Sequence, residues 1–194
     1  MRLILGSTSP YRGELLARLR LPFAQLAAAV DETPMPEEQP AALALRLATT
    51  KARAAAQGQR HAIVIGADQT AECDGLLLGK PGTLARARTQ LTHLAGRSAR
   101  FFTAIALLDT ESGRLLQDLA VTEVRLRNLD AGEIDAYLRL EEPYDCAGSF
   151  KAEGLGIALF EAIHSDDPTA LIGLPLIRVR RLLQALGVPV LGTS

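Results

Sequence analysis

The sequence predicts an α/β fold in which helices flank a mixed β-sheet, built as a single domain over residues 1–194 that is either compact or two-lobed. In the first half, short apolar runs of strand length alternate with longer segments whose apolar residues recur with helical spacing. In the second half, two long strand-like segments joined by a Ser-Gly turn indicate hairpin-like strands. With 48% hydrophobic residues the chain has enough apolar material for a core without disulfide bonds.

A strand, two helices and a loop are predicted in the first 60 residues. Residues 3–6 form a short apolar run typical of a buried strand. Ser9 followed by Pro10 is a strong helix start, and we expect this helix to run to about residue 20. The acidic segment 31–40 contains three prolines and is predicted to be a loop. The Ala-rich segment 41–57 predicts a second helix.

A strand buried on both faces is predicted at residues 62–67, which are rich in Ile and Val. We expect this strand to end there and to place Asp68 at the carboxyl edge of the sheet, where the sites of α/β proteins usually form. The pair Asp74-Gly75 predicts a two-residue hairpin turn between two further short strands, at residues 70–73 and 76–78.

The remaining elements are predicted from their caps and turns. Asp130 and Glu133 form a capping box that opens a helix. The Gly-rich segment 146–154 predicts a loop. The other predicted elements are helices at 83–95, 130–140 and 176–186 and strands at 100–109, 114–127 and 155–164.

The bulk composition argues against several classes of function. A net charge of −1 and a pI of about 6.3 are unsuited to a broad phosphate-backbone interface, so we expect no nucleic-acid partner. Trp is absent and aromatic residues make up 4%, which disfavours a stacking platform for single strands. No apolar run approaches the about 20 residues of a membrane span, and no secretory signal pattern is present, so we expect a soluble, cytoplasmic protein without a membrane partner.

Familiar catalytic and redox motifs are also absent. The sequence has no Gly-x-x-x-x-Gly-Lys-Ser/Thr and no Gly-x-Gly-x-x-Gly, and Ser7 and Ser149 have no His-based activation pattern. Cys73 and Cys146 fit no metal or redox spacing, so we expect two buried free thiols.

The turn Gly6-Ser7-Thr8-Ser9-Pro10 is a candidate phosphate site. A strand, a small-residue turn and a helix N-terminus leave backbone N–H groups aimed at one point, where the helix dipole adds partial positive charge. Ser7 and Ser9 add hydroxyl groups, and Arg12 could hold a phosphate with two hydrogen bonds. The alternative is an ordinary capped helix with a surface arginine.

Acidic and lysine residues supply the other candidates. Asp68 could bind a divalent cation or take a proton from water, whereas the alternative is a turn cap. Glu32, beside Asp31 on the predicted loop, could be an oxygen ligand for Mg²⁺ or part of a solvated surface. Only three of the 21 cationic residues are lysines, and Lys51 and Lys80 are two of them. A compact ammonium suits a phosphate oxygen, although both lysines could simply face solvent.

Taken together, these segments resemble the Maf family of nucleoside triphosphate pyrophosphatases, and within it the 7-methyl-GTP pyrophosphatase subgroup. The motifs follow the family's order over nearly the whole chain, from about residue 3 to residue 187. They lie at residues 5–12, 30–33, 51–52, 66–69, 79–81, 146–150 and 172–175.

The resemblance implies a two-lobed fold with an extended mixed sheet and a cleft between the lobes. It implies hydrolysis of the α–β phosphate bond of 7-methyl-GTP, giving 7-methyl-GMP and diphosphate, with a divalent cation such as Mg²⁺, Mn²⁺ or Co²⁺. Carried over to this sequence, Asp68 is the proton acceptor, Glu32, Lys51 and Lys80 complete the catalytic set, and Glu32 with Asp68 holds the metal. The residues that would bind the triphosphate are Ser7, Ser9, Arg12, Lys51 and Lys80. The family also suggests a homodimer.

Base specificity in the family is tied to the positions of Tyr11, Gln69 and Glu153. The favoured subgroup often carries Trp at the first of these, so Tyr11 departs from it in size but keeps the aromatic face. Two alternatives remain open: a dTTP and UTP pyrophosphatase of the same family, and a non-catalytic nucleotide-binding regulator of septum formation.

Overall fold

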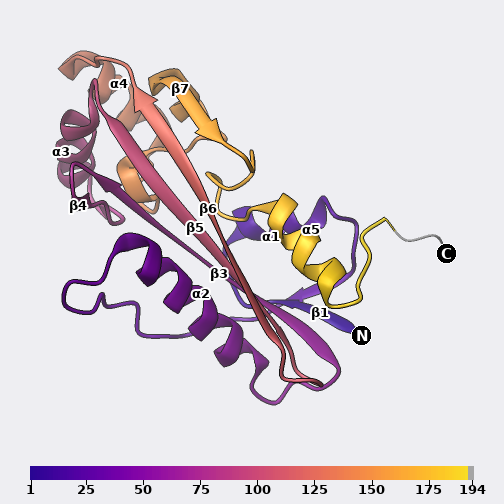
Figure 1. Cartoon of the computed structure of the whole chain (residues 1–194). Helices are drawn as coiled ribbons and strands as arrows, with labels where there is room; N and C mark the ends of the chain where they lie inside the picture. The colour runs from indigo at the N-terminus through magenta and orange to yellow at the C-terminus, as the bar shows by residue number, and fades with distance from the viewer. Residues whose placement is uncertain (192–194) are drawn as a thin grey trace. The chain divides into compact units, whose positions relative to one another are not determined.

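The computed structural model describes residues 1–191, which form seven strands and five α-helices (Figure 1). The strands are β1 Arg2–Leu5, β2 Phe23–Gln25, β3 Ala62–Cys73, β4 Leu76–Leu77, β5 Ser98–Asp109, β6 Leu115–Leu126 and β7 Phe160–Ser165. The helices are α1 Pro10–Ala17, α2 Pro40–Ala56, α3 Leu84–Leu94, α4 Ala131–Glu141 and α5 Leu176–Ala185, with short 3-10 turns η1 Ala147–Ser149 and η2 Leu155–Leu159.

The strands form one mixed sheet in the order β2-β1-β3-β5-β6-β7, with β4 paired to β3. β1 is parallel to both β2 and β3, whereas β4 and β7 are antiparallel to β3 and β6. This confirms the predicted α/β class and the mixed sheet. None of the helices in residues 1–191 is long and apolar enough to cross a membrane.

The described residues divide into two compact units. The first comprises Met1–Gln69, Thr103–Ala120 and the segment from Asp167 onward, and the second comprises Thr70–Phe102 and Val121–Asp166. β3, β5 and β6 contribute residues to both units.

The core of the first unit has two layers because the side chains of its strands alternate between the faces of the sheet. Leu5 and Ile65 pack with apolar residues of α1 and α5. Ile4 and Val64 point to the opposite face and pack with Ala55 of α2. The sheet of this unit therefore lies between α2 and the pair α1 and α5 (Figure 1).

The prediction that a strand ends before Asp68 is wrong. β3 continues from Ala62 to Cys73 without a break, so Asp68 lies inside a long strand and the two predicted strands are one. Its parallel neighbour β1 is short and makes its last register pair with Ile65. Asp68 is therefore beyond the carboxyl end of β1 although it is not at the end of its own strand.

The contact between α2 and β3 depends on Gly66. A Cβ atom at this position would lie 2.0 Å from the carbonyl oxygen of Ala48 and 2.4 Å from the backbone nitrogen of Ala52. Only glycine permits the helix backbone to approach the strand this closely. The short distance brings this turn of α2, which also carries Lys51, close to the strand that carries Asp68.

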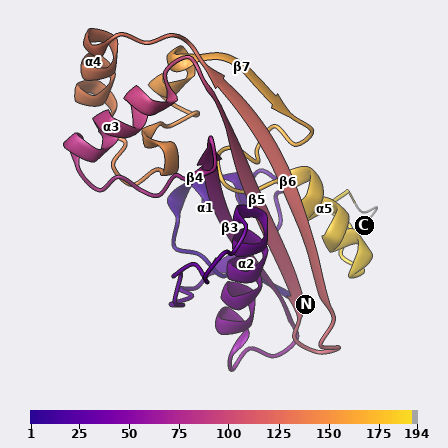
Figure 2. The same ribbon diagram turned by 60° about the vertical axis from the view of Figure 1, so that its left-hand side comes forward.

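In the second unit, α3 packs on α4 and on η1 (Figure 2). Asp130 and Glu133 form the predicted capping box at the start of α4. The Phe150 ring packs against Phe101 and Phe160, with centroid distances of 5.3 and 4.8 Å.

Two predictions for this unit need correction. The strand predicted at residues 155–164 begins only at Phe160, because Leu155–Leu159 form the 3-10 turn η2. Both thiols are free, but Cys146 is half-buried rather than buried like Cys73.

Candidate active site

The turn after β1 is held by side-chain hydrogen bonds. The Ser7 hydroxyl accepts from the backbone N–H of Ser9 at 3.2 Å, and the Ser9 hydroxyl accepts from the N–H of Arg12 at 3.4 Å. Ser9 is therefore the N-cap of α1, as predicted. Gln25 of β2 donates its amide hydrogens to the carbonyl oxygens of Ser7 and Ser9 at 3.1 and 3.3 Å. The turn is thus fixed in shape before any ligand binds.

Arg12 is half-buried and points back over this turn. Its Nε donates to the carbonyl oxygen of Gly173 at 3.0 Å, and a terminal nitrogen donates to the Ser7 hydroxyl at 3.4 Å. Burial lowers the pKa of Arg12, whereas the negative charges of Asp68 and Glu32 raise it. The alternative interpretation of a surface arginine is wrong, and the guanidinium lies in the electric field of both predicted acids.

Lys51 connects the two acids. Its Nζ lies 2.5 Å from a carboxylate oxygen of Glu32 and 2.6 Å from Oδ1 of Asp68. The side chains of Lys51 and Asp68 are 10% and 9% exposed, whereas that of Glu32 is 56% exposed. Lys51 is therefore not a solvent-facing helix lysine, and Asp68 is not a turn cap. Three predicted site residues from a loop, a helix and a strand meet at one ammonium group.

Burial raises the pKa of Asp68 above its ordinary value, although the charges of Lys51 and Arg12 act in the opposite direction. Loss of hydration disfavours the carboxylate more than the two cations favour it. A carboxylate with a raised pKa is a stronger proton acceptor than an exposed one, provided that it is still ionised at the working pH. The environment of Asp68 suits the role of a general base.

The loop that carries Glu32 is attached to α2 by one arginine. Arg46 donates to both carboxylate oxygens of Glu38 at 2.7 and 2.8 Å and to the carbonyl oxygen of Thr33 at 3.0 Å. Asp31 accepts from the backbone N–H of Thr33 at 2.9 Å. The predicted loop is confirmed, and these contacts fix the backbone on the carboxyl side of Glu32.

The donor chemistry of Glu32 and Asp68 fits a hard divalent cation. Mg²⁺ and similar ions bind carboxylate oxygens, commonly one or two from the protein with phosphate oxygens completing the shell. Both carboxylates already turn toward one cationic centre, the Lys51 ammonium. The half-exposed Glu32 side chain leaves access to that point from solvent.

The amide of Gln69 has a defined orientation. Its nitrogen lies 2.8 Å from the Thr103 hydroxyl, 3.0 Å from the Ala170 carbonyl oxygen and 3.1 Å from the Leu171 carbonyl oxygen. A flipped amide would place its oxygen against carbonyl oxygens that cannot donate, so the nitrogen must face them. The amide oxygen of Gln69 is therefore turned away from the Ala170 and Leu171 carbonyl oxygens.

The remaining predicted site residues are Tyr11, Lys80 and Glu153. Tyr11 is half-buried on the first turn of α1, beside Arg12. Lys80 and Glu153 are exposed and belong to the second unit. Their roles toward a nucleotide stay predictions.

Several supporting residues were not found from the sequence. Each of them uses its side chain to contact a site segment that lies far from it in the sequence. They are Gln25, Arg46 and Thr103. Asp167 was not singled out from the sequence, although its side chain is fully buried. An acid directly before a proline, as in Asp167-Pro168, is the one sequence signal that could have drawn attention to it.

Comparisons with known proteins identify the family of this chain. A family model described as Maf-like protein matches residues 2–186. A 7-methyl-GTP pyrophosphatase of Burkholderia pseudomallei (strain 1710b) is 58% identical over 194 residues, covering 98% of this chain and 90% of that protein. A protein of the same name from Polaromonas sp. (strain JS666 / ATCC BAA-500) is 58% identical, covering 96% of this chain and 85% of that protein. Another, from Cupriavidus metallidurans (strain ATCC 43123 / DSM 2839 / NBRC 102507 / CH34), is 53% identical, covering 98% of this chain and 96% of that protein.

Among solved structures, the Ham1 protein of Staphylococcus aureus is similar with a TM-score of 0.50 at 14% identity, over 80% of this chain and 90% of that one. At this identity the likeness concerns the fold alone.

Proposed function

Because this chain belongs to the Maf-like protein family, we propose that it is a nucleoside triphosphate pyrophosphatase that hydrolyses 7-methyl-GTP to 7-methyl-GMP and diphosphate. The relatives of that name are 53–58% identical over nearly the whole chain. The alternatives of a dTTP and UTP pyrophosphatase and of a non-catalytic regulator have no comparable support.

The observation that carries the proposal is the meeting of Glu32, Lys51 and Asp68 beside the turn that Arg12 covers. A buried carboxylate of raised pKa, a second carboxylate and two cations are the groups that hydrolysis of a phosphate anhydride requires. A protein that only binds a nucleotide has no need of a buried proton acceptor at this point.

The triphosphate binds through groups of the first unit. The N-terminus of α1 offers backbone N–H groups and its dipole, and Ser7 and Ser9 add hydroxyl donors. Arg12 and Lys51 neutralise phosphate charge. The family resemblance also assigns Lys80, as a compact ammonium, to the triphosphate.

The chemical step is the attack of one water molecule on phosphorus at the α–β anhydride. The water oxygen forms a bond to phosphorus, the bond from phosphorus to the bridging oxygen breaks, and diphosphate leaves. Asp68 takes the proton of the water. Arg12 and Lys51 stabilise the negative charge that develops on the oxygens.

Glu32 and Asp68 are the residues that would hold a divalent cation. When bound, Mg²⁺, Mn²⁺ or Co²⁺ supplies Lewis-acid polarisation and further charge neutralisation at the phosphates. The carboxylate pair around a single cationic centre supports this assignment.

Base selectivity follows from hydrogen-bond polarity. The guanine edge presents N–H donors, and the oriented oxygen of Gln69 and the carboxylate of Glu153 are both acceptors. N7-methylation makes the base cationic, so stacking on the Tyr11 ring gains about 0.5–2 kcal/mol. Uracil and thymine present two carbonyl oxygens on either side of a single N–H, and these oxygens would be repelled by the two acceptors.

The proposal includes a cytoplasmic homodimer, on the strength of the family resemblance. Sedimentation at several protein concentrations measures the oligomeric state.

A substrate panel tests the proposed function. Purified protein is incubated with 7-methyl-GTP, GTP, UTP or dTTP and a divalent cation, and diphosphate release is measured. We expect 7-methyl-GTP to give the highest kcat/KM. Faster hydrolysis of UTP and dTTP would assign the chain to the pyrimidine branch, and nucleotide binding without diphosphate release would contradict an enzymatic role.

A further inference from the structure

The segment from Asp167 to Pro175, here called the acceptor loop, holds predicted site residues through its backbone carbonyl oxygens. The carbonyl of Gly173 accepts from Arg12, and the carbonyls of Ala170 and Leu171 accept from Gln69. The same loop therefore orients one residue assigned to phosphate and one assigned to the base.

The acceptor loop has a conformation that few sequences allow at its centre. Gly173 has φ of +123°, a region that is favourable only for glycine. Its carbonyl direction, and with it the position of Arg12, depends on that backbone conformation. Contacts that hold the loop backbone on both sides of Gly173 are therefore needed to keep its carbonyl in place.

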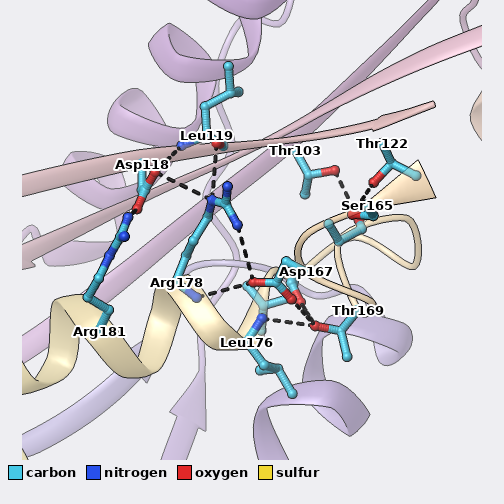
Figure 3. A network of polar contacts seen from close by, with 12 residues as sticks. Thr103, Asp118, Leu119, Thr122, Ser165, Asp167, Thr169, Leu176, Arg178 and Arg181 are labelled. Atoms are coloured by element: carbon cyan, nitrogen blue, oxygen red, sulfur yellow. Dashed lines mark hydrogen bonds and ion pairs between the residues drawn. The ribbon is translucent and has the colours of Figure 1, made fainter.

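Asp167 fixes the loop from within the protein (Figure 3). Its side chain is fully buried. One carboxylate oxygen accepts from the backbone N–H of Arg178 at 3.1 Å and lies 3.8 Å from the Arg178 guanidinium. The other lies 3.1 Å from the Thr169 hydroxyl, whose single proton can be donated either to it or to the Leu174 carbonyl oxygen 2.8 Å away. Asp167 thereby attaches the start of the loop to the first turn of α5.

Thr169 attaches the end of the loop to its start. Its hydroxyl accepts from the backbone N–H of Leu176 at 2.9 Å and lies 2.8 Å from the Leu174 carbonyl oxygen. The acceptor loop is thus closed on itself between Asp167 and the N-terminus of α5 (Figure 3).

An aspartate suits this position because the groups that contact one of its carboxylate oxygens can only donate. These groups are the backbone N–H and the guanidinium of Arg178. An ionised carboxylate accepts at both oxygens, whereas an asparagine would present one amide nitrogen that cannot accept. Asp167→Asn therefore changes polarity with almost no change in size.

We propose that Asp167 is a positioning residue that fixes the carbonyl oxygens of the acceptor loop and thereby orients Gln69 and Arg12 toward the nucleotide. Asp167 itself touches neither residue in the hydrogen bonds described, so it acts through the loop backbone. The proposal rests on the proposed function for the nucleotide and for the roles of Gln69 and Arg12 in binding it.

Asp118 provides a matched control because it contacts the same arginine from a different element. Asp118 lies on β6, 3.5 Å from the Nε of Arg178, and it also pairs with Arg181 (Figure 3). Asp118→Asn weakens the attachment of α5 without touching the acceptor loop. It separates a general loss of stability from a loss of loop geometry.

The experiment measures kcat and KM for 7-methyl-GTP and UTP in the wild type, Asp167→Asn, Asp118→Asn, Gln69→Ala and the double variant Asp167→Asn/Gln69→Ala. We expect Asp167→Asn to lower the 7-methyl-GTP to UTP ratio of kcat/KM about tenfold, the effect of one misplaced charge-assisted contact. Asp118→Asn leaves this ratio unchanged. In the Gln69→Ala background, Asp167→Asn no longer changes the ratio because the two residues act together.

The proposal is overturned if Asp167→Asn keeps the wild-type ratio, or if it lowers the ratio equally with and without Gln69. Circular dichroism verifies that each variant is folded. If Asp167→Asn does not fold, Thr169→Val opens the same loop, and a wild-type ratio in that variant overturns the proposal.

The same experiment separates this inference from the proposed function. A wild-type protein that prefers another nucleotide contradicts the 7-methyl-GTP assignment. The ratio of kcat/KM is then measured between that nucleotide and one whose base has the opposite pattern of hydrogen-bond donors and acceptors. The comparison of variants still decides the role of Asp167.

Discussion

Lys51 shows why the type of cation matters at the scale of single residues. Its ammonium lies within 2.6 Å of carboxylate oxygens from Glu32 and Asp68. A planar guanidinium spreads its charge over a wider fork and would not place it at one point between two carboxylates. Arginine occupies 18 of the 21 cationic positions of the chain. The lysine at this position is therefore explained by the geometry of the two carboxylates and not by the overall composition.

Asp68→Asn should abolish turnover while the protein stays folded, because an amide cannot take the proton of the attacking water. The raised pKa means that the folded state disfavours the ionised form of Asp68. Removing the ionisable group should therefore leave the thermal midpoint unchanged or raise it. Diphosphate release and thermal unfolding of both proteins measure the two effects.

The stability gain should disappear on acidification. Protonation relieves the burial cost in the wild type as the pH falls through the raised pKa of Asp68, so the two midpoints converge at low pH. Retained hydrolysis of 7-methyl-GTP by Asp68→Asn would remove Asp68 from the role of proton acceptor.

At the scale of elements, α2 positions site residues through contacts on two of its sides. One side approaches β3 at Gly66 and carries Lys51, and the other carries Arg46, which holds the loop of Glu32. The loop has no regular secondary structure, so its position depends on these side-chain contacts. Through these contacts, α2 sets the positions of Glu32 and Asp68 relative to one another.

Glu38→Gln should change the acid stability of this attachment. The hydrogen bonds from Arg46 lower the pKa of Glu38 from 4.5 to about 2. A depressed pKa stabilises the fold fully above the ordinary value, and this stabilisation is lost as the pH falls through about 2. Between these limits the thermal midpoint of Glu38→Gln should therefore depend less steeply on pH than that of the wild type.

Glu37→Gln is the matched control, because Glu37 is exposed and has no ion pair within residues 1–191. Its midpoint should follow the wild-type curve. Identical curves for Glu38→Gln and the wild type would show that the ion pair does not stabilise the fold in solution.

The sequence predicted most elements because their signals are local. Ser9 and the Asp130 capping box mark helix starts through contacts within four residues. The strand over residues 62–67 was predicted too short because Asp68 and Gln69 are polar, although buried partners satisfy both. At residues 155–159 the apolar run reads as a strand, but the chain turns there in the 3-10 conformation.

The residues of the candidate site could be predicted where a local signal or a family motif marks them. Ser9 is marked by the helix cap, and Lys51 and Asp68 lie in segments that match family motifs. The orientation of Gln69 was not predictable, because it depends on carbonyl groups about one hundred residues further along the chain. Contacts of that range leave no pattern in a single sequence.

At the scale of the whole molecule, three long strands belong to both units. β3, β5 and β6 each continue from one unit into the other along an unbroken backbone. Separate unfolding of one unit would leave half of each strand without its neighbours. We expect the two units to unfold together, in accord with the prediction of a single domain.

The cysteines provide the probe for this prediction. Both belong to the second unit, and burial raises the pKa of Cys73 and raises that of Cys146 to about 12. From an ordinary value of 9.0, this reduces the thiolate fraction of Cys146 about a thousandfold, so labelling of the native protein is slow. In urea, thiol labelling should rise at the same midpoint as the loss of far-ultraviolet circular dichroism, which follows the helices of both units.

Two separate midpoints would show that the units are independent in stability. Cys146→Ser assigns the labelling signal to Cys73 alone, and its midpoint should match that of the wild type.

The close approach at Gly66 has a consequence for attempts to give this scaffold a new substrate. An added methyl group there would lie 2.0 Å from the Ala48 carbonyl oxygen, so a mutant library that varies this position would displace the helix before it altered any binding preference. Residues 48, 52 and 66 are best held constant in such a library. Diversity is better placed at Tyr11 and Glu153, whose side chains border solvent and can change in size without disturbing the helix–strand contact.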